Sequence, residues 1–202
     1  SSLFAFITGT GDIASEGFRI IASHSDSPTF KIKPNPEIIK ENHFITLNTE
    51  VYGGPILMTW LDRPLSIAGR VSLESNNPLR PNNVLIDFKR PVTIIPNLAI
   101  HLNRSVNEGV ELNRQVDMLP LIGEIEPGTT ATDFFKSAIA TELNTTPDKV
   151  LDYDLTLYDT TQGTLMGFNN EFISSSRIDN LAMAHSSLLA IYNAKPQPFT
   201  QM

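Results

Sequence analysis

The sequence predicts an α/β protein whose middle section is a β-rich, antiparallel subdomain. Short apolar runs of alternating or β-branched residues, which are typical of strands, fill most of the first 125 residues, and helical periodicity appears only later. Prolines interrupt the middle section at positions 55, 64, 78, 81, 91, 96 and 120. Because proline lacks the backbone N–H that a central strand donates, this pattern favours an antiparallel sheet over a parallel one.

The expected strands fall into two sections. The first section holds 3–7, 18–22 and 29–33, and the middle section holds 44–52, 65–73, 84–88, 92–95, 98–102 and 118–122. We expect the sequence Pro34-Asn35-Pro36 to end the first section, because turn residues cluster there and a residue before proline avoids the helical region.

Helices are expected in the later part of the chain. Thr132 is a suitable N-cap for a helix of about 12 residues, whose apolar residues recur at helical spacing: Phe134, Phe135, Ala138, Ile139 and Leu143. Alternation predicts a strand over 151–158, and residues 163–172 are expected to form a loop. A second amphipathic helix is expected to carry Leu181, Ala184, Leu188, Leu189 and Tyr192 on one face.

Composition excludes several classes of partner. The formal net charge is -7 and the pI is near 5.0, and Lys and Arg do not cluster, which argues against nucleic-acid binding. No apolar run approaches the ~20 residues that span a bilayer, so no membrane partner is expected. The chain contains no cysteine, which excludes disulfides and thiolate metal sites and leaves histidine and carboxylates as ligands. A cytoplasmic location is expected.

The first candidate for chemistry is residues 24–28, His-Ser-Asp-Ser-Pro, which follow the apolar run 18–22. In an extended chain, residues two apart share a face, so His24 and Asp26 are expected to point one way and Ser25 and Ser27 the other. A neutral imidazole can ligate zinc, and a neighbouring carboxylate can fix its tautomer. The alternative interpretation is a solvated strand end without a metal.

The second candidate, Asp179, lies at or just before the first turn of the last expected helix. The helix dipole favours a carboxylate there whatever its function. A simple helix cap is therefore the alternative to a functional role.

Four segments together resemble the M18 aminopeptidases, the aspartyl aminopeptidase family. They are residues 24–28, residues 52–71 with Tyr-Gly-Gly, Thr-Trp-Leu-Asp-Arg-Pro-Leu and Gly-Arg-Val, residues 95–102, and residues 169–181 with Asn-Asn-Glu-Phe-Ile and Arg-Ile-Asp-Asn-Leu. The segments occur in the family's order over nearly the whole chain. Ser25 stands where the family has threonine.

The resemblance implies a two-zinc exopeptidase with an α/β catalytic domain into which a β-rich, antiparallel dimerisation domain is inserted. Residues 1–34 would then begin the catalytic domain, 35–160 would form the insertion, and 161–202 would return to a catalytic domain that is truncated here. His24 matches the first zinc ligand and Asp26 the catalytic carboxylate that orients it. Asp179 matches the aspartate that bridges both zinc ions, and a cis peptide bond often precedes the residue at the position of Asn180 in the wider clan.

The same resemblance implies a substrate and a partner. His101 matches a histidine that reaches the active site of the partner subunit and helps to hold a peptide substrate. The family prefers acidic N-terminal residues, Asp or Glu, and assembles as a homo-oligomer built from dimers. Its Glu-Glu pair, a later aspartate and a final histidine would all follow Met202, so we expect these 202 residues alone to be inactive.

Two other functions remain open. The chain could be a non-catalytic dimerisation or assembly module in which only the β-rich section folds well. It could also come from another two-zinc hydrolase of the same clan, such as a carboxypeptidase or deacylase. Such an enzyme would share His24, Asp26 and Asp179 but lack the block 52–71.

Overall fold

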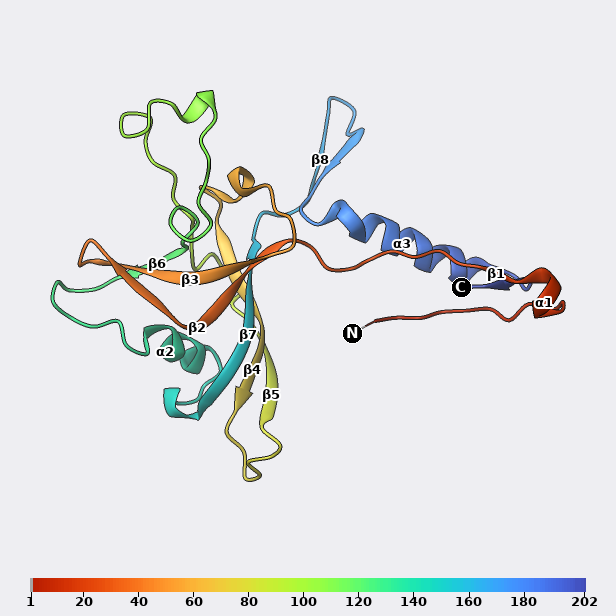
Figure 1. Cartoon of the computed structure of the whole chain (residues 1–202), viewed down its shortest axis with the longest axis horizontal. Coiled ribbons are helices and arrows are strands. Elements are labelled where there is room, and N and C mark those ends of the chain that lie inside the picture. Colours follow the sequence, from red (N-terminus) through yellow and green to blue (C-terminus); the bar gives the residue numbers. More distant parts are fainter. Residues whose placement is uncertain (1) are drawn as a thin grey trace. The chain divides into compact units, whose positions relative to one another are not determined.

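The computed structural model describes residues 2–202, which divide into two compact units (Figure 1). Residues 28–162 form one unit, called here the barrel unit. Residues 2–27 and 163–202 form the other, called here the flanking unit. The divisions between the units lie after residues 27 and 162.

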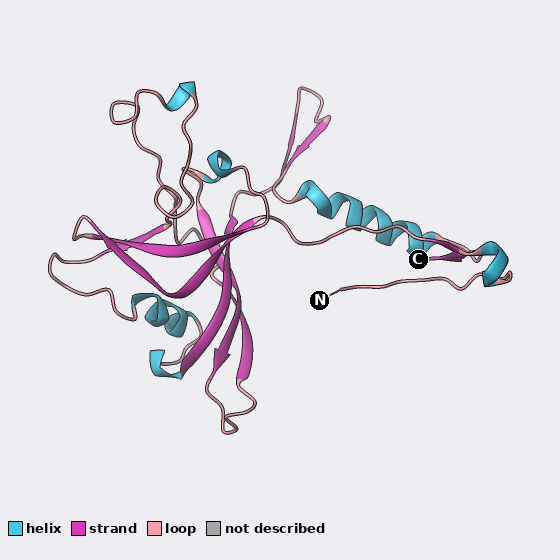
Figure 2. Ribbon diagram, viewed as in Figure 1, coloured by secondary structure: helices cyan, strands magenta, loops and turns pink. Residues whose placement is uncertain are grey.

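The barrel unit is built on one six-stranded sheet whose neighbouring strands are all antiparallel (Figure 2). The strand order is β5-β4-β7-β2-β3-β6. The strands are β2 (Thr29–Lys40), β3 (Phe44–Tyr52), β4 (Leu65–Leu73), β5 (Asn82–Asp87), β6 (Leu121–Glu124) and β7 (Val150–Asp159). One helix, α2 (Phe134–Glu142), and three short 3-10 turns, Leu57–Trp60, Val106–Glu108 and Pro147–Lys149, complete the unit.

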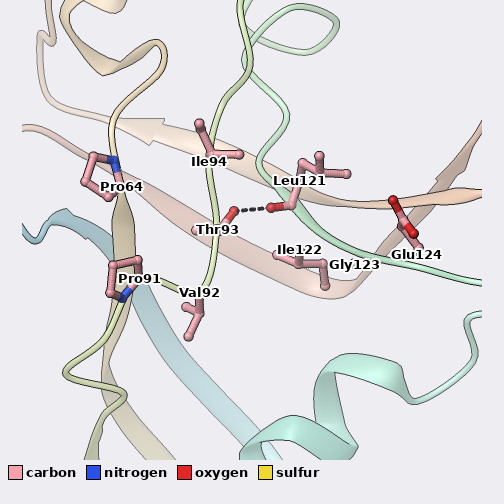
Figure 3. A pocket seen from close by; sticks show the side chains of 9 residues that line it. All are labelled: Pro64, Pro91, Val92, Thr93, Ile94, Leu121, Ile122, Gly123 and Glu124. Atoms are coloured by element: carbon pink, nitrogen blue, oxygen red, sulfur yellow. Dashed lines mark hydrogen bonds between the residues drawn. The ribbon is translucent and has the colours of Figure 1, made fainter.

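Residues 92–95 close this sheet on itself. Thr93 pairs with Leu65 at the start of β4, and Ile94 pairs with Leu121 at the start of β6. The Thr93 hydroxyl also donates a 2.8 Å hydrogen bond to the Leu121 carbonyl (Figure 3). Residues 91–94 and 121–124, together with Pro64, line a shallow pocket of about 430 Å³. Its lining is apolar apart from Thr93 and Glu124.

Alternation along the strands fills the barrel with apolar side chains. In β7, Leu155 and Leu157 are at most 2% exposed while Thr156 between them is half-buried. In β3, Ile45 and Leu47 are fully buried. Helix α2 adds Phe135 and Ile139 to the same core, and the Phe135 ring meets Tyr153 edge-on with centroids 5.5 Å apart. Period-two alternation in the sequence thus becomes the inner face of the sheet.

The flanking unit consists of short elements around one long helix. These are α1 (Ile13–Glu16), β1 (Phe18–Arg19), β8 (Thr164–Met166), β9 (Phe172–Ser174), α3 (Ile178–Asn193) and β10 (Thr200–Gln201). Strands β1 and β10 pair in parallel, and β8 and β9 form an antiparallel hairpin. No apolar side chain of this unit is buried among its described residues. Within residues 2–202, no helix meets the length and hydropathy required to cross a membrane.

Three elements differ from the sequence prediction, because local bulge, turn and capping geometry outweighed the apolar pattern. Strand β2 continues through Pro34 and Pro36, because a bulge between Ile32 and Glu37 absorbs them. The expected strand 98–102 is a turn, in which the Leu102 N–H donates to the Ala99 carbonyl at 2.8 Å. Helix α2 begins after Asp133, one residue later than Thr132 predicted.

The expected strand 3–7 has a ladder partner at one residue only, since Ile7 forms an isolated bridge to Gln201. The expected loop 163–172 instead contains most of the β8–β9 hairpin. The mostly antiparallel character of the sheet is confirmed, as are the bounds expected for β3 and β4.

Candidate metal centre

His24 and Asp26 lie in an irregular segment that follows β1 within the flanking unit. The His24 Nδ1 atom lies 3.0 Å from the Asp26 main-chain oxygen and 3.3 Å from its Oδ1 atom. The side chains therefore meet, although residues 24–28 do not form the strand on which this expectation was based. Both remain accessible, with 54% of the His24 side chain and 60% of the Asp26 side chain exposed.

These contacts indicate which tautomer the neutral imidazole adopts. A carbonyl oxygen can only accept a hydrogen bond, so the Nδ1 atom facing Asp26 is the one that carries the proton. In the neutral ring, the Nε2 atom then keeps its lone pair. This is the tautomer that a zinc ligand requires, with a carboxylate on the opposite nitrogen.

Asp179 meets the other side of the same ring. Its Oδ1 atom lies 3.6 Å from His24 Nε2, although 155 residues separate the two in the sequence. Asp179 sits in the first turn of α3 with non-helical angles, φ -84° and ψ 110°, and the peptide bond to Asn180 is cis, as the resemblance implied. Its side chain is 96% exposed, so nothing covers the carboxylate within the part of the chain described.

The spacing of these two groups fits one shared metal ion. Two ligands held about 2.1 Å from a tetrahedral zinc ion lie roughly 3.4 Å apart, and His24 Nε2 and Asp179 Oδ1 are 3.6 Å apart. A catalytic zinc site normally has three protein ligands, and no cluster of three such groups exists among residues 2–202. Among the described residues, His24 and Asp179 are therefore two groups at a spacing that one ion could share, and the Asp26 carboxylate lies on the opposite nitrogen of the His24 ring.

The other three histidines lie outside this cluster. His101 is exposed in the long connection between β5 and β6 of the barrel unit. His43 belongs to the β2–β3 turn, where its Nε2 atom lies 3.6 Å from a Glu124 carboxylate oxygen. His185 lies on α3, away from the first turn that carries Asp179.

A hollow of about 1090 Å³ extends from the His24 segment along α3. Its walls are mainly apolar and include Ile20, Leu181, Leu188 and Ile191. The exposed fractions of Ile20 and Leu188 are 63% and 49%. The candidate centre therefore lies at one end of an open, apolar surface.

The sequence pattern missed one residue at this centre. Ser27 was expected to face away from His24 and Asp26, but its hydroxyl donates to the main-chain oxygen of Asp179 at 3.4 Å. The prediction was wrong because residues 24–28 do not form a strand, so strict alternation does not apply to them. A serine three positions after the candidate ligand His24 was the only signal in the sequence.

A histidine and a carboxylate at the spacing of one ion, on a mixed α and β scaffold, are the kind of pair that a metal-dependent hydrolase brings together. The family model described as "Aminopeptidase I zinc metalloprotease (M18)" matches residues 1–201. The chain belongs to the M18 peptidase family, and the resemblance inferred from the four segments is confirmed.

The curated and solved relatives support the same assignment. The chain is 54% identical over 195 residues to a probable M18 family aminopeptidase 2 of Clostridium acetobutylicum, covering 96% of this chain and 45% of that protein. It therefore spans less than half the length of this relative.

Two solved structures show the same fold. The cryo-EM structure of the Ape4 and Nbr1 complex matches with a TM-score of 0.81 at 31% identity, covering 97% of this chain and 41% of the other. The structure of the S. cerevesiae mApe1 dodecamer matches with a TM-score of 0.72 at 22% identity, covering 97% of this chain and 44% of the other.

Proposed function

We propose that this chain carries the first metal ligands of a zinc aminopeptidase that removes N-terminal residues from peptides. The observation that supports this proposal is the 3.6 Å separation between His24 Nε2 and Asp179 Oδ1, in a chain whose family is described as zinc metalloproteases. A likeness in sequence alone would not require two residues so far apart in the chain to meet.

Each residue has a distinct role in the proposed centre. His24 would hold zinc through Nε2, and Asp26 would accept the hydrogen bond from the Nδ1–H group and hold the ring in that orientation. Asp179 would be the carboxylate ligand common to both ions of the family's centre. The metal would supply a nucleophile from water at neutral pH and polarise the scissile carbonyl.

The substrate is proposed to be a peptide with an acidic N-terminal residue, Asp or Glu. This preference comes from the family resemblance, and no residue of the described chain is assigned to reading the acid. His101 is proposed to hold substrate in a partner subunit, since it is exposed on a connection that runs from β5 to β6.

The barrel unit is proposed to be the inserted dimerisation domain of a homo-oligomeric enzyme. Its own core and its antiparallel sheet, including the closure at residues 92–95, support a separately folded insertion. The dodecameric assembly of the yeast relative is consistent with oligomers built through such a domain.

The metal assignment is tested by substitutions in the aminopeptidase that contains this chain. We expect His24→Ala and Asp179→Asn each to reduce zinc content, measured by elemental analysis, and to reduce hydrolysis of Asp- and Glu-p-nitroanilide more than 100-fold. This exceeds the roughly 10- to 100-fold cost in metal affinity or activity typical of a residue that only orients a ligand, which is the range expected for Asp26→Asn.

His185→Ala is the matched control, because this histidine lies in the same unit but not in the cluster. Its zinc content and hydrolysis rate should equal those of the unsubstituted enzyme. Normal zinc content in His24→Ala would overturn the assignment.

The 202-residue chain alone is proposed to be inactive. Two donors cannot complete a catalytic site that normally takes three from the protein. Elemental analysis of this chain should find substoichiometric zinc. Two tightly bound zinc ions per chain would contradict the proposal.

A second candidate function is a self-association module without catalysis, favoured by the self-contained core of the barrel unit. Light scattering over a concentration range distinguishes a dimer from a monomer for the chain alone. The hydrolysis assay above then separates an enzyme that also associates from a module that only associates.

A further inference from the structure

We propose that Ser27 is a positioning residue of the metal centre, which holds the main chain of Asp179 at the distance from His24 that a shared ion requires. This inference rests on the proposed function. Ser27 is not a ligand, and its effect is exerted through Asp179.

The hydroxyl of Ser27 connects two segments that are 152 residues apart. Its oxygen lies 3.4 Å from the main-chain oxygen of Asp179, and because that oxygen is only an acceptor, the serine must donate. Both residues belong to the flanking unit. Ser27 is also half-buried, whereas the neighbouring residues 24–26 and Pro28 are exposed.

Asp179 depends on such an external contact because the helix holds it loosely. Asp179 and Asn180 have non-helical backbone angles within α3, so the regular helical backbone begins only after them. The side chain is 96% exposed, and the described contact that it makes is with the His24 imidazole. Outside α3 itself, the described chain gives Asp179 two partners, the imidazole of His24 and the hydroxyl of Ser27.

The distance tolerance of a metal site makes this contact important. Metal–ligand distances normally lie within about 0.2 Å of their ideal values, and His24 Nε2 and Asp179 Oδ1 are already spaced for one ion before any ion binds. Ser27 and His24 lie on the same short segment, so the hydroxyl and the imidazole both contact Asp179 from one stretch of main chain. Removing the hydroxyl leaves the carboxylate to be positioned by the ion itself, which lowers affinity.

Ser25 provides a matched control. It lies in the same segment and is also a serine, but it is exposed and has no hydrogen-bond partner among residues 2–202. A general effect of removing a hydroxyl from this segment would therefore appear in both Ser25→Ala and Ser27→Ala. An effect through Asp179 would appear in Ser27→Ala alone.

The test measures the dissociation constant of Zn²⁺ by competition with a chromogenic chelator in the aminopeptidase that contains this chain. We expect Ser27→Ala to raise the dissociation constant roughly 10- to 100-fold, the range observed when an outer-shell partner is lost. Ser27→Thr, which keeps a hydroxyl at this position, should have a dissociation constant within about 3-fold of the original value. Ser25→Ala should leave the dissociation constant unchanged. The melting temperature of the metal-free protein should be the same in all variants.

The outcomes separate this inference from the proposed function. If His24→Ala abolishes zinc binding but Ser27→Ala binds as the original protein does, Ser27 has no positioning role and the zinc site stands. If His24→Ala leaves zinc binding intact, the proposed function fails. If Ser27→Ala lowers the metal-free melting temperature and Ser27→Thr fails to restore zinc affinity, the serine is structural and the inference is overturned.

Discussion

The two units of this chain differ most in how much apolar surface they bury. Every buried apolar side chain of the described residues lies in the barrel unit, between Phe30 and Leu157. In the flanking unit, Thr200 is the one described residue that is buried, and large apolar residues such as Leu3 and Phe172 are 77% and 64% exposed.

Because of this difference, the unit that provides most of the buried apolar surface is not the unit that carries the candidate metal-binding residues. The barrel unit closes its sheet and fills it, so burial offsets the conformational entropy of its own residues. The flanking unit carries His24, Asp26, Ser27 and Asp179 without a core beneath them. We therefore expect substitutions to have large effects on stability in the barrel unit and small effects in the flanking unit.

Hydrogen exchange of the 202-residue chain should show the largest contrast. We expect amides of β4 and β7 to exchange only through global unfolding, which for a typical domain costs about 5–15 kcal/mol. Amides of α3 should exchange at least 1000-fold faster, because little buried surface opposes local opening. Mass spectrometry of peptides from the two units measures this ratio. Equal protection in α3 and β7 would show that the flanking unit is as stable as the barrel.

The same substitution in each unit makes the comparison direct. Phe30 is fully buried and meets Trp60 edge-on with ring centroids 5.0 Å apart, so Phe30→Ala should cost about 3–5 kcal/mol. Phe172→Ala in β9 should change stability by less than about 1 kcal/mol, since that ring is largely exposed. Urea unfolding followed by circular dichroism gives both values. A cost above 2 kcal/mol for Phe172→Ala would be inconsistent with the exposed hairpin.

A glycine tests the tight pairing of β4 and β7. Gly69 has φ +153°, and a Cβ atom there would clash with the Asp154 carbonyl oxygen. Gly69→Ala should therefore cost about 2–4 kcal/mol. Gly54→Ala is the control, because a Cβ at that position meets nothing within 4 Å. Its effect should stay within about 0.5 kcal/mol, and a similar loss in both variants would rule out close strand pairing as the cause.

The smallest expected effect is a pH dependence at the edge of the barrel. Burial raises the pKa of Asp159, but hydrogen bonds from Thr161 and the nearby Arg63 guanidinium outweigh it, so the net pKa lies below the ordinary value. A depressed pKa in the folded state stabilises the protein above the unfolded value, near pH 4, and this contribution is lost as pH falls through the folded value.

Arg63→Met should remove part of this contribution, so that less stability is lost when the pH falls below 4. The change should be less than about 1 kcal/mol, because the arginine is 44% exposed and solvent weakens its interaction with Asp159. Urea unfolding at pH 3 and pH 6 measures the change. Glu171, whose pKa is lowered by backbone and Asn169 hydrogen bonds, is the counterpart in the flanking unit. Glu171→Gln should leave the pH dependence of barrel unfolding unchanged.

Sequence periodicity predicted the regular strands well and the irregular segments poorly. The bounds of β3 and β4 were predicted correctly because apolar residues alternate along most of each strand, although both faces are buried at 45–47 and 65–67. Residues 98–102 carry a similar apolar pattern but form a turn, beside which Asp62 and Asn97 side chains accept hydrogen bonds from the N–H groups of Asn97 and Leu98. Such local side-chain contacts compete with a strand ladder and leave no periodic signal.

By itself, the sequence determined the family, the antiparallel character of the middle section and the residues with metal-binding chemistry, because motif order, proline positions and residue types are properties of the linear chain. Only the tertiary structure decided that His24 and Asp179 approach to 3.6 Å, that Ser27 faces Asp179, and that residues 92–95 close the sheet. These outcomes depend on contacts between residues far apart in the chain, and no local pattern encodes the distance between two such side chains.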